Sequence, residues 1–255
     1  NIAETLALDV RTPTYLKNNN EEYEFLKKLN ADLALVVAYG QIIPENYLTL
    51  AKKGFINIHA SLLPKYRGAA PIQRSIMNLE KQTGITIMKI NSKLDEGPIC
   101  NSYKIDIDQN DNLDELSEKL SALASEKILD EIDNIIDDKA IFKDQDHKLA
   151  SYAKKIDKKE GSIDWNTPAI NIIAKINGLN GAYFFFKGHR YKILKAELNN
   201  LSGDPGEIIG DSLEIACKEK SIKVLMIQRE GKKPQKISEF LLGSQIKKGL
   251  FLNNA

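Results

Sequence analysis

Three polar residues of this chain could act together on an acyl group. Asn57 and His59 are separated by one residue, and Asp95 stands two residues before Gly97. An amide can stabilise a developing oxyanion, an imidazole can carry a proton, and a carboxylate can orient the imidazole. A single histidine at a strand end is more often structural, and Asp-x-Gly is common in turns. Spacing alone therefore leaves both interpretations open.

The neighbouring sequence predicts how these side chains are positioned. The short β-rich run 54–58 predicts a strand, in which Asn57 and His59 point to the same side. Asp95 follows another expected strand, 84–91. Because the carboxyl ends of parallel strands meet at one edge of a sheet, we expect Asp95 to hydrogen-bond His59 and fix its tautomer.

Alternating helical and apolar runs indicate an α/β fold in the first half of the chain. Helices are expected over 21–29, 44–52, 71–79 and 113–136, and strands over 31–38, 54–58, 84–91 and 99–105. Strands separated by helices favour a mostly parallel sheet with helices on both faces.

The second half has a different pattern, with one short helix at 169–176 followed by β-like runs at intervals of roughly ten residues. These runs are 182–186, 190–194, 206–209, 213–217 and 222–227. They predict a small barrel or sandwich. We therefore expect a catalytic domain at 1–137, a linker at 138–154 and a second domain at 155–255.

Composition and motifs exclude several function classes. Hydrophobic residues make up 42% and charged residues 28% of 255 residues, as in ordinary globular proteins. No apolar run approaches a membrane span, and the acidic first residues predict no secretory signal. Dinucleotide, P-loop and nucleophile-elbow motifs are absent from the sequence. Cys100 and Cys217 are expected to be buried free thiols, and with three separated histidines we expect no metal site.

Charge is divided unequally along the chain. Residues 1–150 hold 18 Lys and Arg against 24 Asp and Glu, a net charge of −6, whereas residues 151–255 hold 18 against 11, a net charge of +7. A basic second domain suggests a polyanionic partner, although a solvated lysine-rich surface gives the same balance.

The motifs resemble those of the formyltransferases that use 10-formyltetrahydrofolate. The resemblance rests on Asn57-Ile58-His59-Ala60-Ser61-Leu62-Leu63-Pro64, Tyr66-Arg67-Gly68-Ala69-Ala70-Pro71-Ile72-Gln73, Gly84-Ile85-Thr86-Ile87-Met88 and Asp95-Glu96-Gly97. It implies a Rossmann-like first domain in which Asn57, His59 and Asp95 are the catalytic trio. It also implies that Ser61, Leu62, Leu63 and Pro64 border the folate site. The loop 38–44 resembles the segment that lines the pterin pocket, and no metal is required.

The second domain indicates which branch of the family this chain resembles. The segments 155–165, 228–233 and 240–243 are similar to the OB-like C-terminal domain of the branch that formylates methionyl-tRNA. The resemblance implies initiator methionyl-tRNA and the folate donor as partners, with Lys232 and Lys233 as candidate phosphate contacts. A solvated lysine pair is the alternative interpretation. We expect a monomer without membrane association, in the cytoplasm of a bacterium or in an organellar matrix.

Two departures from the family pattern leave alternatives open. Family members open with about sixty further residues, including a first strand and a basic loop that inserts into the tRNA acceptor stem, so we expect an upstream segment to be missing. The turn 177–182 also differs from the family sequence. The alternatives are an amino-sugar nucleotide formyltransferase, and a catalytically inactive tRNA-binding protein.

Overall fold

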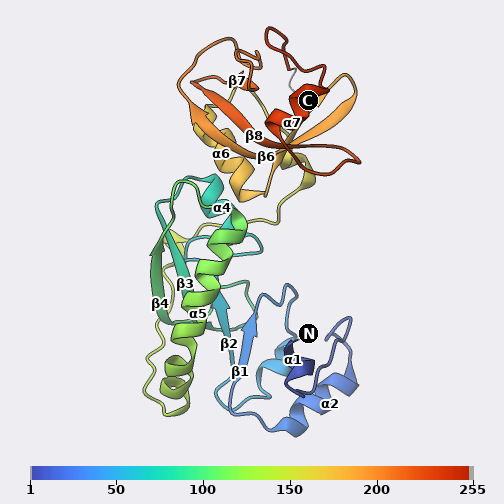
Figure 1. Cartoon of the computed structure of the whole chain (residues 1–255). Helices are drawn as coiled ribbons and strands as arrows, with labels where there is room; N and C mark the ends of the chain where they lie inside the picture. Colours follow the sequence, from blue (N-terminus) through green and yellow to red (C-terminus); the bar gives the residue numbers. More distant parts are fainter. Residues whose placement is uncertain (1, 253–255) are drawn as a thin grey trace.

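The chain folds into two units stacked end to end, as seen in a computed structural model that describes residues 2–252 (Figure 1). The first unit contains helices α1 (Ile2–Thr5), α2 (Asn20–Leu29), α3 (Glu45–Leu48), α4 (Pro71–Met77) and α5 (Leu113–Ile136), and strands β1 (Ala34–Val37), β2 (Phe55–His59), β3 (Gln82–Lys89) and β4 (Ile99–Asp106). Short 3-10 helices follow at His147–Leu149 and Lys158–Gly161. Every helix and strand expected in the first half is present, within a few residues of its expected ends.

The sheet of the first unit is mixed, with strand order β1-β2-β3-β4. Strands β1 and β2 are parallel, as expected, but β2 pairs with β3 and β3 with β4 in antiparallel fashion. The expectation of a mostly parallel sheet is therefore corrected for these four strands. The short loop 90–98 between β3 and β4 suits antiparallel neighbours, since a parallel pair needs a longer crossover.

The two faces of this sheet have different roles. Ile56 and Ile87 point to one face, where Ile135 of α5 packs against them in a buried cluster. Residues of opposite parity in β2, including Asn57 and His59, point to the other face. Helix α5 thus covers one face of the sheet, and Asn57 and His59 point to the opposite face.

Helix α5 has a clear beginning and a buried stripe, which explains why its bounds match the expected 113–136. Asn112 caps the helix by accepting from the backbone N–H groups of Asp114 and Glu115, and the Glu115 carboxylate accepts from the N–H of Asn112. Leu116 and Leu120, four residues apart, are both buried against the sheet.

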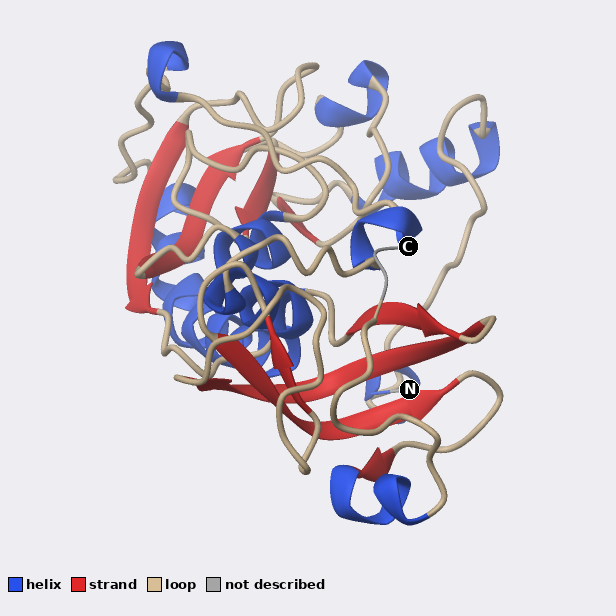
Figure 2. Cartoon of the chain, turned by 90° about the horizontal axis from the view of Figure 1, so that it is seen from above, coloured by secondary structure: helices blue, strands red, loops and turns tan. Residues whose placement is uncertain are grey.

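The second unit is built on a five-stranded antiparallel sheet. It contains α6 (Ala169–Gly178), β5 (Ala182–Phe186), β6 (His189–Asn199), β7 (Glu214–Ala216), β8 (Ser221–Arg229), β9 (Gln235–Lys236) and α7 (Ile237–Leu242). The strand order is β5-β6-β8-β7, and β9 pairs with β8. In the view from above, the strands of the molecule gather in two separate groups with helices beside them (Figure 2).

Two expectations for the second unit need correction. The run 190–194 is the first half of the longer strand β6, whose pairing with β8 shifts register around Lys195. Such a bulge interrupts the alternation of apolar and polar residues that marks a strand. The run 206–209 is not a strand; Glu207 and Ile208 make only isolated bridges, to Phe251 and Ile215. Helix α7 was not expected.

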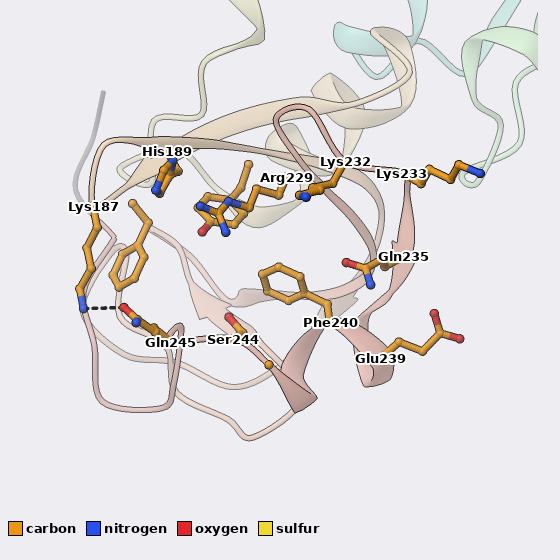
Figure 3. Close-up of a pocket in the computed structure, with 13 residues that line it drawn as sticks. Lys187, His189, Arg229, Lys232, Lys233, Gln235, Glu239, Phe240, Ser244 and Gln245 are labelled. Carbon is orange, nitrogen blue, oxygen red and sulfur yellow. Dashed lines mark hydrogen bonds between the residues drawn. The ribbon is translucent and has the colours of Figure 1, made fainter.

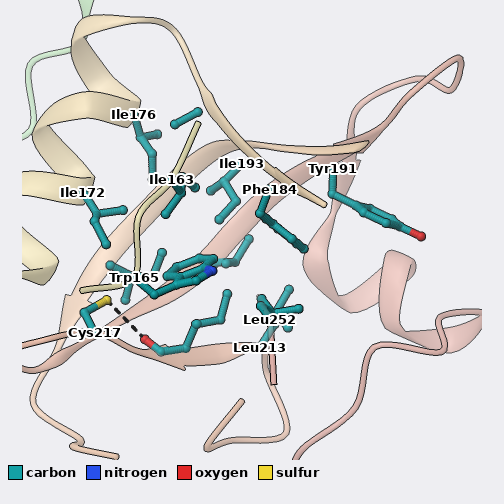
Figure 4. Close-up of a cluster of buried hydrophobic side chains, with 14 of the residues drawn as sticks. Ile163, Trp165, Ile172, Ile176, Phe184, Tyr191, Ile193, Leu213, Cys217 and Leu252 are labelled. Atoms are coloured by element: carbon teal, nitrogen blue, oxygen red, sulfur yellow. Dashed lines mark hydrogen bonds between the residues drawn. The ribbon is translucent and has the colours of Figure 1, made fainter. Parts of the chain in front are cut away.

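A separate hydrophobic core holds the second unit together (Figure 4). Trp165 is 1% exposed and lies edge-to-face with Phe184, which stacks on Tyr191. Cys217 is buried in this core, and Cys100 is partly buried in the first unit. Both are free thiols, and burial raises the pKa of each to about 12. The expectation of buried free thiols is confirmed for Cys217, whereas Cys100 is a free thiol that is only partly buried.

The two units touch where α4 of the first meets α6 of the second. A Cβ atom at Gly178 would lie 2.8 Å from Cγ of Met77, so this glycine permits the close approach. Nearby, the Arg74 guanidinium forms a bidentate ion pair with the Glu160 carboxylate. This pair lowers the pKa of Glu160 to about 2, with the backbone N–H of Asp157 as the second cause.

Candidate active site

His59 ends strand β2 and is almost completely buried, with 6% of the side chain exposed. Its Nε2 lies 2.9 Å from the carbonyl oxygen of Tyr66. A carbonyl oxygen only accepts, so Nε2 must carry the hydrogen. The tautomer is therefore fixed by the Tyr66 carbonyl, and Nδ1 is the ring nitrogen left to gain or lose a proton.

Asp95 lies opposite that free nitrogen. Its Oδ2 is 3.7 Å from Nδ1 of His59, so the structure brings the two residues together. The distance is too long for a hydrogen bond, and the expectation that Asp95 fixes the tautomer by such a bond is corrected. The two residues also meet for a different reason from the expected one. Strand β3 runs antiparallel to β2, so the carboxyl ends of these strands do not lie at the same edge of the sheet. Asp95 reaches His59 because the loop 90–98 folds back.

The backbone around Asp95 is held in an unusual conformation. Asp95 has a φ of +51°, in the left-handed region, which aspartate and asparagine adopt more readily than most other non-glycine residues. Its Oδ2 accepts a 2.8 Å hydrogen bond from the backbone N–H of Gly68. Gly68 itself has a φ of +114°, and a Cβ there would lie 2.8 Å from the carbonyl oxygen of Ala153. The position of the carboxylate thus depends on a glycine at 68.

Asn57 occupies the position in β2 two residues before His59, partly buried and on the same face of the strand. Its backbone pairs with Val36 of β1 and Met88 of β3, so Asn57 lies in the interior of the sheet. The structure therefore places the amide beside the imidazole, on the face that also receives the Asp95 loop.

The segment Ser61–Pro64 forms the turn that follows β2. The Ser61 hydroxyl donates to the carbonyl of Lys65 at 2.7 Å, and the Ser61 side chain is fully buried. The Thr86 hydroxyl donates to the Ser61 carbonyl and accepts from the Leu63 N–H. These bonds fix the turn shape. Leu62 lines a separate cavity of about 590 Å³, whose walls include none of the three catalytic candidates.

Two buried residues to which the sequence analysis gave no role hold the loops of the site together. Arg67 is 1% exposed, and Gln145 is 6% exposed. The Gln145 side-chain oxygen accepts from Arg67 Nε at 3.1 Å and from its terminal nitrogen at 2.7 Å. Another guanidinium nitrogen of Arg67 lies 3.2 Å from the Glu96 carboxylate. Gln145 belongs to the segment expected as a linker, where no local pattern marked it.

A second hollow lies in the basic unit, between β6, β8 and α7 (Figure 3). Its volume is about 700 Å³. Lysines 187, 232 and 233 and Arg229 line it together with the rings of Phe186, Tyr191 and Phe240. Glu239 is the single acidic residue among those lining it. We call this hollow the basic groove; it contains both lysines expected to contact phosphate.

Residues 2–252 contain neither a helix that could span a membrane nor a cluster of metal-ligating side chains. In that part of the chain, no helix has the length and apolar character needed to cross a bilayer. Within the same residues, no group of three or more His, Cys, Asp or Glu side chains is arranged to hold a metal ion.

Comparison with known proteins identifies the family. Residues 6–132 match the family described as formyl transferase, and residues 155–245 match the formyl transferase C-terminal domain. The chain is 63% identical over 257 aligned residues to a methionyl-tRNA formyltransferase of Pelagibacter ubique, covering 99% of this chain and 83% of that protein. The chain belongs to the methionyl-tRNA formyltransferase family. A relative with the same name in Caldanaerobacter subterraneus is 41% identical, with 95% of this chain and 81% of that protein covered.

Solved structures show the same fold in more distant formyltransferases. HypX from Aquifex aeolicus in complex with tetrahydrofolic acid aligns with a TM-score of 0.68 and 16% identity, over 86% of this chain and 40% of that one. WlaRD, a sugar 3N-formyl transferase solved with dTDP and 5-N-formyl-THF, aligns with a TM-score of 0.64 and 21% identity, over 91% and 81%. The expected α/β formyltransferase domain with a separate β-rich domain is thus confirmed.

Proposed function

We propose that this chain transfers the formyl group of 10-formyltetrahydrofolate to the α-amine of methionyl-tRNA. The observation that carries the proposal is the meeting of Asn57, His59 and Asp95 on one face of β2, in a chain 63% identical to a methionyl-tRNA formyltransferase. The proposal assigns the three residues catalytic roles.

The reaction needs one bond made and one broken at the formyl carbon. The methionyl amine attacks that carbon, and the carbonyl oxygen becomes an oxyanion in the tetrahedral intermediate. The amide of Asn57 donates to this oxyanion, and the positive charge of protonated His59 stabilises it electrostatically. Collapse breaks the bond to N10 of the folate, which takes up a proton while the amine loses one. No external oxidant or reductant is involved.

The geometry at His59 defines where its proton enters. Nε2 donates to the Tyr66 carbonyl, so protonation occurs at Nδ1, which faces Asp95 across 3.7 Å. The Asp95 carboxylate stabilises the resulting imidazolium electrostatically. A small movement of either side chain closes this distance to a hydrogen bond, as catalytic contacts often tighten only when substrate is bound. Asp95 then helps to move the amine's proton.

The folate donor is assigned to the turn Ser61–Pro64. Because the Ser61 hydroxyl, the Ser61 carbonyl and the Leu63 N–H are already hydrogen-bonded within the fold, we propose that this turn borders the donor as a rigid wall and not through unpaired polar groups. Two structural relatives were solved with tetrahydrofolic acid and with 5-N-formyl-THF, which supports a folate-derived donor.

The basic groove is the proposed contact with tRNA. Its four cationic side chains outnumber the single acidic one, Glu239, and suit the phosphate backbone. The rings of Phe186 and Phe240 add an apolar floor on which an unpaired base could stack. This charge balance favours tRNA over an amino-sugar nucleotide as the acceptor. The domain limits 1–137, 138–154 and 155–255, and a cytoplasmic monomer, stay predictions.

The choice of acceptor can be tested directly. Purified chain is incubated with 10-formyltetrahydrofolate and either methionyl-tRNA or a dTDP-linked amino sugar, and formylated product is quantified by mass spectrometry. The proposal predicts product only with methionyl-tRNA. Formylation of the amino sugar, or salt-sensitive tRNA binding without formylation of either acceptor, would contradict it.

A further inference from the structure

Backbone hydrogen bonds join the segment between α5 and the second unit to the first unit. The backbone N–H of Arg67 donates to the Ser151 carbonyl at 2.9 Å, and the Ala153 N–H donates to the Arg67 carbonyl at 2.7 Å. At the other end of the segment, Lys143 and Ile99 exchange backbone hydrogen bonds. Residues 143–153 therefore run against the first unit and are part of its structure.

Gln145 lies in this segment, and its side chain uses its full hydrogen-bonding capacity. Nε2 donates to the carbonyl oxygens of Asp95 and Gly97, both at 2.8 Å. The amide oxygen accepts two bonds from Arg67. Two donors and two acceptor positions are all that a glutamine amide has. A flipped amide would set NH₂ against the guanidinium and oxygen against two carbonyls, so the orientation is unambiguous.

Asp95 is consequently held at two points. Gly68 donates to its carboxylate, and Gln145 donates to its backbone carbonyl. Asp95 has a left-handed backbone, which aspartate adopts more readily than most non-glycine residues, and these hydrogen bonds hold that conformation in place. Gln145 supplies such contacts on both sides of Glu96, the residue that also pairs with Arg67.

We propose that Gln145 is a positioning residue for formyl transfer, whose amide fixes the Asp95 loop so that the carboxylate stays opposite His59. This inference rests on the proposed role of Asp95. Gln145 does not touch the reacting atoms in this account; it acts through Asp95. A misplacement of about 1 Å in a catalytic group can cost on the order of a hundredfold in rate.

The substitution Gln145→Glu separates the hydrogen bonds that this side chain accepts from those that it donates. A carboxylate keeps acceptor oxygens for Arg67 but replaces the NH₂ donor by an oxygen that faces two carbonyls. We expect kcat to fall by about tenfold to a hundredfold, with KM for methionyl-tRNA and for the folate donor within about twofold of wild type. Gln109→Glu introduces the same change at an exposed turn and serves as the matched control, with unchanged kcat.

A double-mutant cycle with Asp95→Asn distinguishes positioning from a general structural role. If Gln145 acts through the Asp95 carboxylate, Gln145→Glu costs little further kcat in the Asp95→Asn background. A cost that stays the same in both backgrounds, or a normal kcat in Gln145→Glu, overturns the inference. If Gln145→Glu does not fold, the uncharged Gln145→Met takes its place in the cycle. Near-normal turnover of Asp95→Asn alone would instead count against the proposed function.

Discussion

The substitution Asp95→Asn removes one negative charge and little else. The asparagine side-chain oxygen can still accept from the Gly68 N–H, as the Asp95 Oδ2 does at 2.8 Å, so the loop keeps its main anchors. What is lost is the attraction between the carboxylate and an imidazolium at His59. Both side chains are largely buried, with 15% and 6% exposed.

The size of this loss follows from the distance of 3.7 Å between Oδ2 and Nδ1. With an effective dielectric constant of about 20, two unit charges at this separation attract each other by about 4.5 kcal/mol. One factor of ten in rate corresponds to about 1.4 kcal/mol, so the charge can contribute at most about two thousandfold. We therefore expect kcat to fall between about tenfold and a thousandfold.

The assay is single-turnover formylation of methionyl-tRNA at saturating 10-formyltetrahydrofolate, with urea denaturation of both proteins as the folding control. The free energy of unfolding should change little, because the hydrogen bond to Gly68 is retained. A turnover within threefold of wild type, in a variant that remains folded, would refute the electrostatic role assigned to Asp95.

Three other predictions concern the remaining parts of the site and the junction of the units. Asn57→Ala should lower kcat by roughly a hundred- to a thousandfold in the same assay, because one oxyanion donor contributes about 2.7 to 4 kcal/mol; a normal rate would exclude the amide from catalysis. Lys232→Ala should weaken tRNA binding and reduce the slope of log K against log salt by about 1, with kcat unchanged, as measured by filter binding over a range of salt concentrations. Arg74 lowers the pKa of Glu160 to about 2, so the pair stabilises the fold above about pH 4.5 and loses this contribution as the pH falls toward 2. Urea unfolding at pH 6 and pH 3 should therefore show a smaller acid-induced loss in Glu160→Gln than in wild type, and an equal loss would contradict this sign.

The sequence predicted those features that depend on local patterns. The stripe containing Leu116 and Leu120 and the cap at Asn112 define α5 within the chain itself, and alternation places Asn57 and His59 on one face of β2. Strand direction depends on which strands meet in space, and the antiparallel pairing of β3 was not predicted. The bulge near Lys195 similarly concealed the full length of β6.

Local sequence patterns did not predict the contacts that hold the site together. Gln145 stands fifty residues after Asp95 in a polar segment, and only the folded chain brings its amide to the Asp95 carbonyl at 2.8 Å. The Tyr66 carbonyl that fixes the His59 tautomer is a backbone group, which no side-chain motif reveals. The family motifs named the residues of the trio, and the structure identified what orients them.

Formyl transfer to methionyl-tRNA depends, in the proposed mechanism, on His59 and its neighbours. The most direct measurement compares the single-turnover rate of formyl-methionyl-tRNA formation by the wild-type chain and by His59→Gln, whose amide can still donate to the Tyr66 carbonyl but cannot take up a proton. We expect rapid formylation by wild type and a loss of at least about a hundredfold in the variant, with tRNA affinity unchanged. Equal rates in the two proteins, or no formylation by a wild-type chain that binds tRNA, would contradict it.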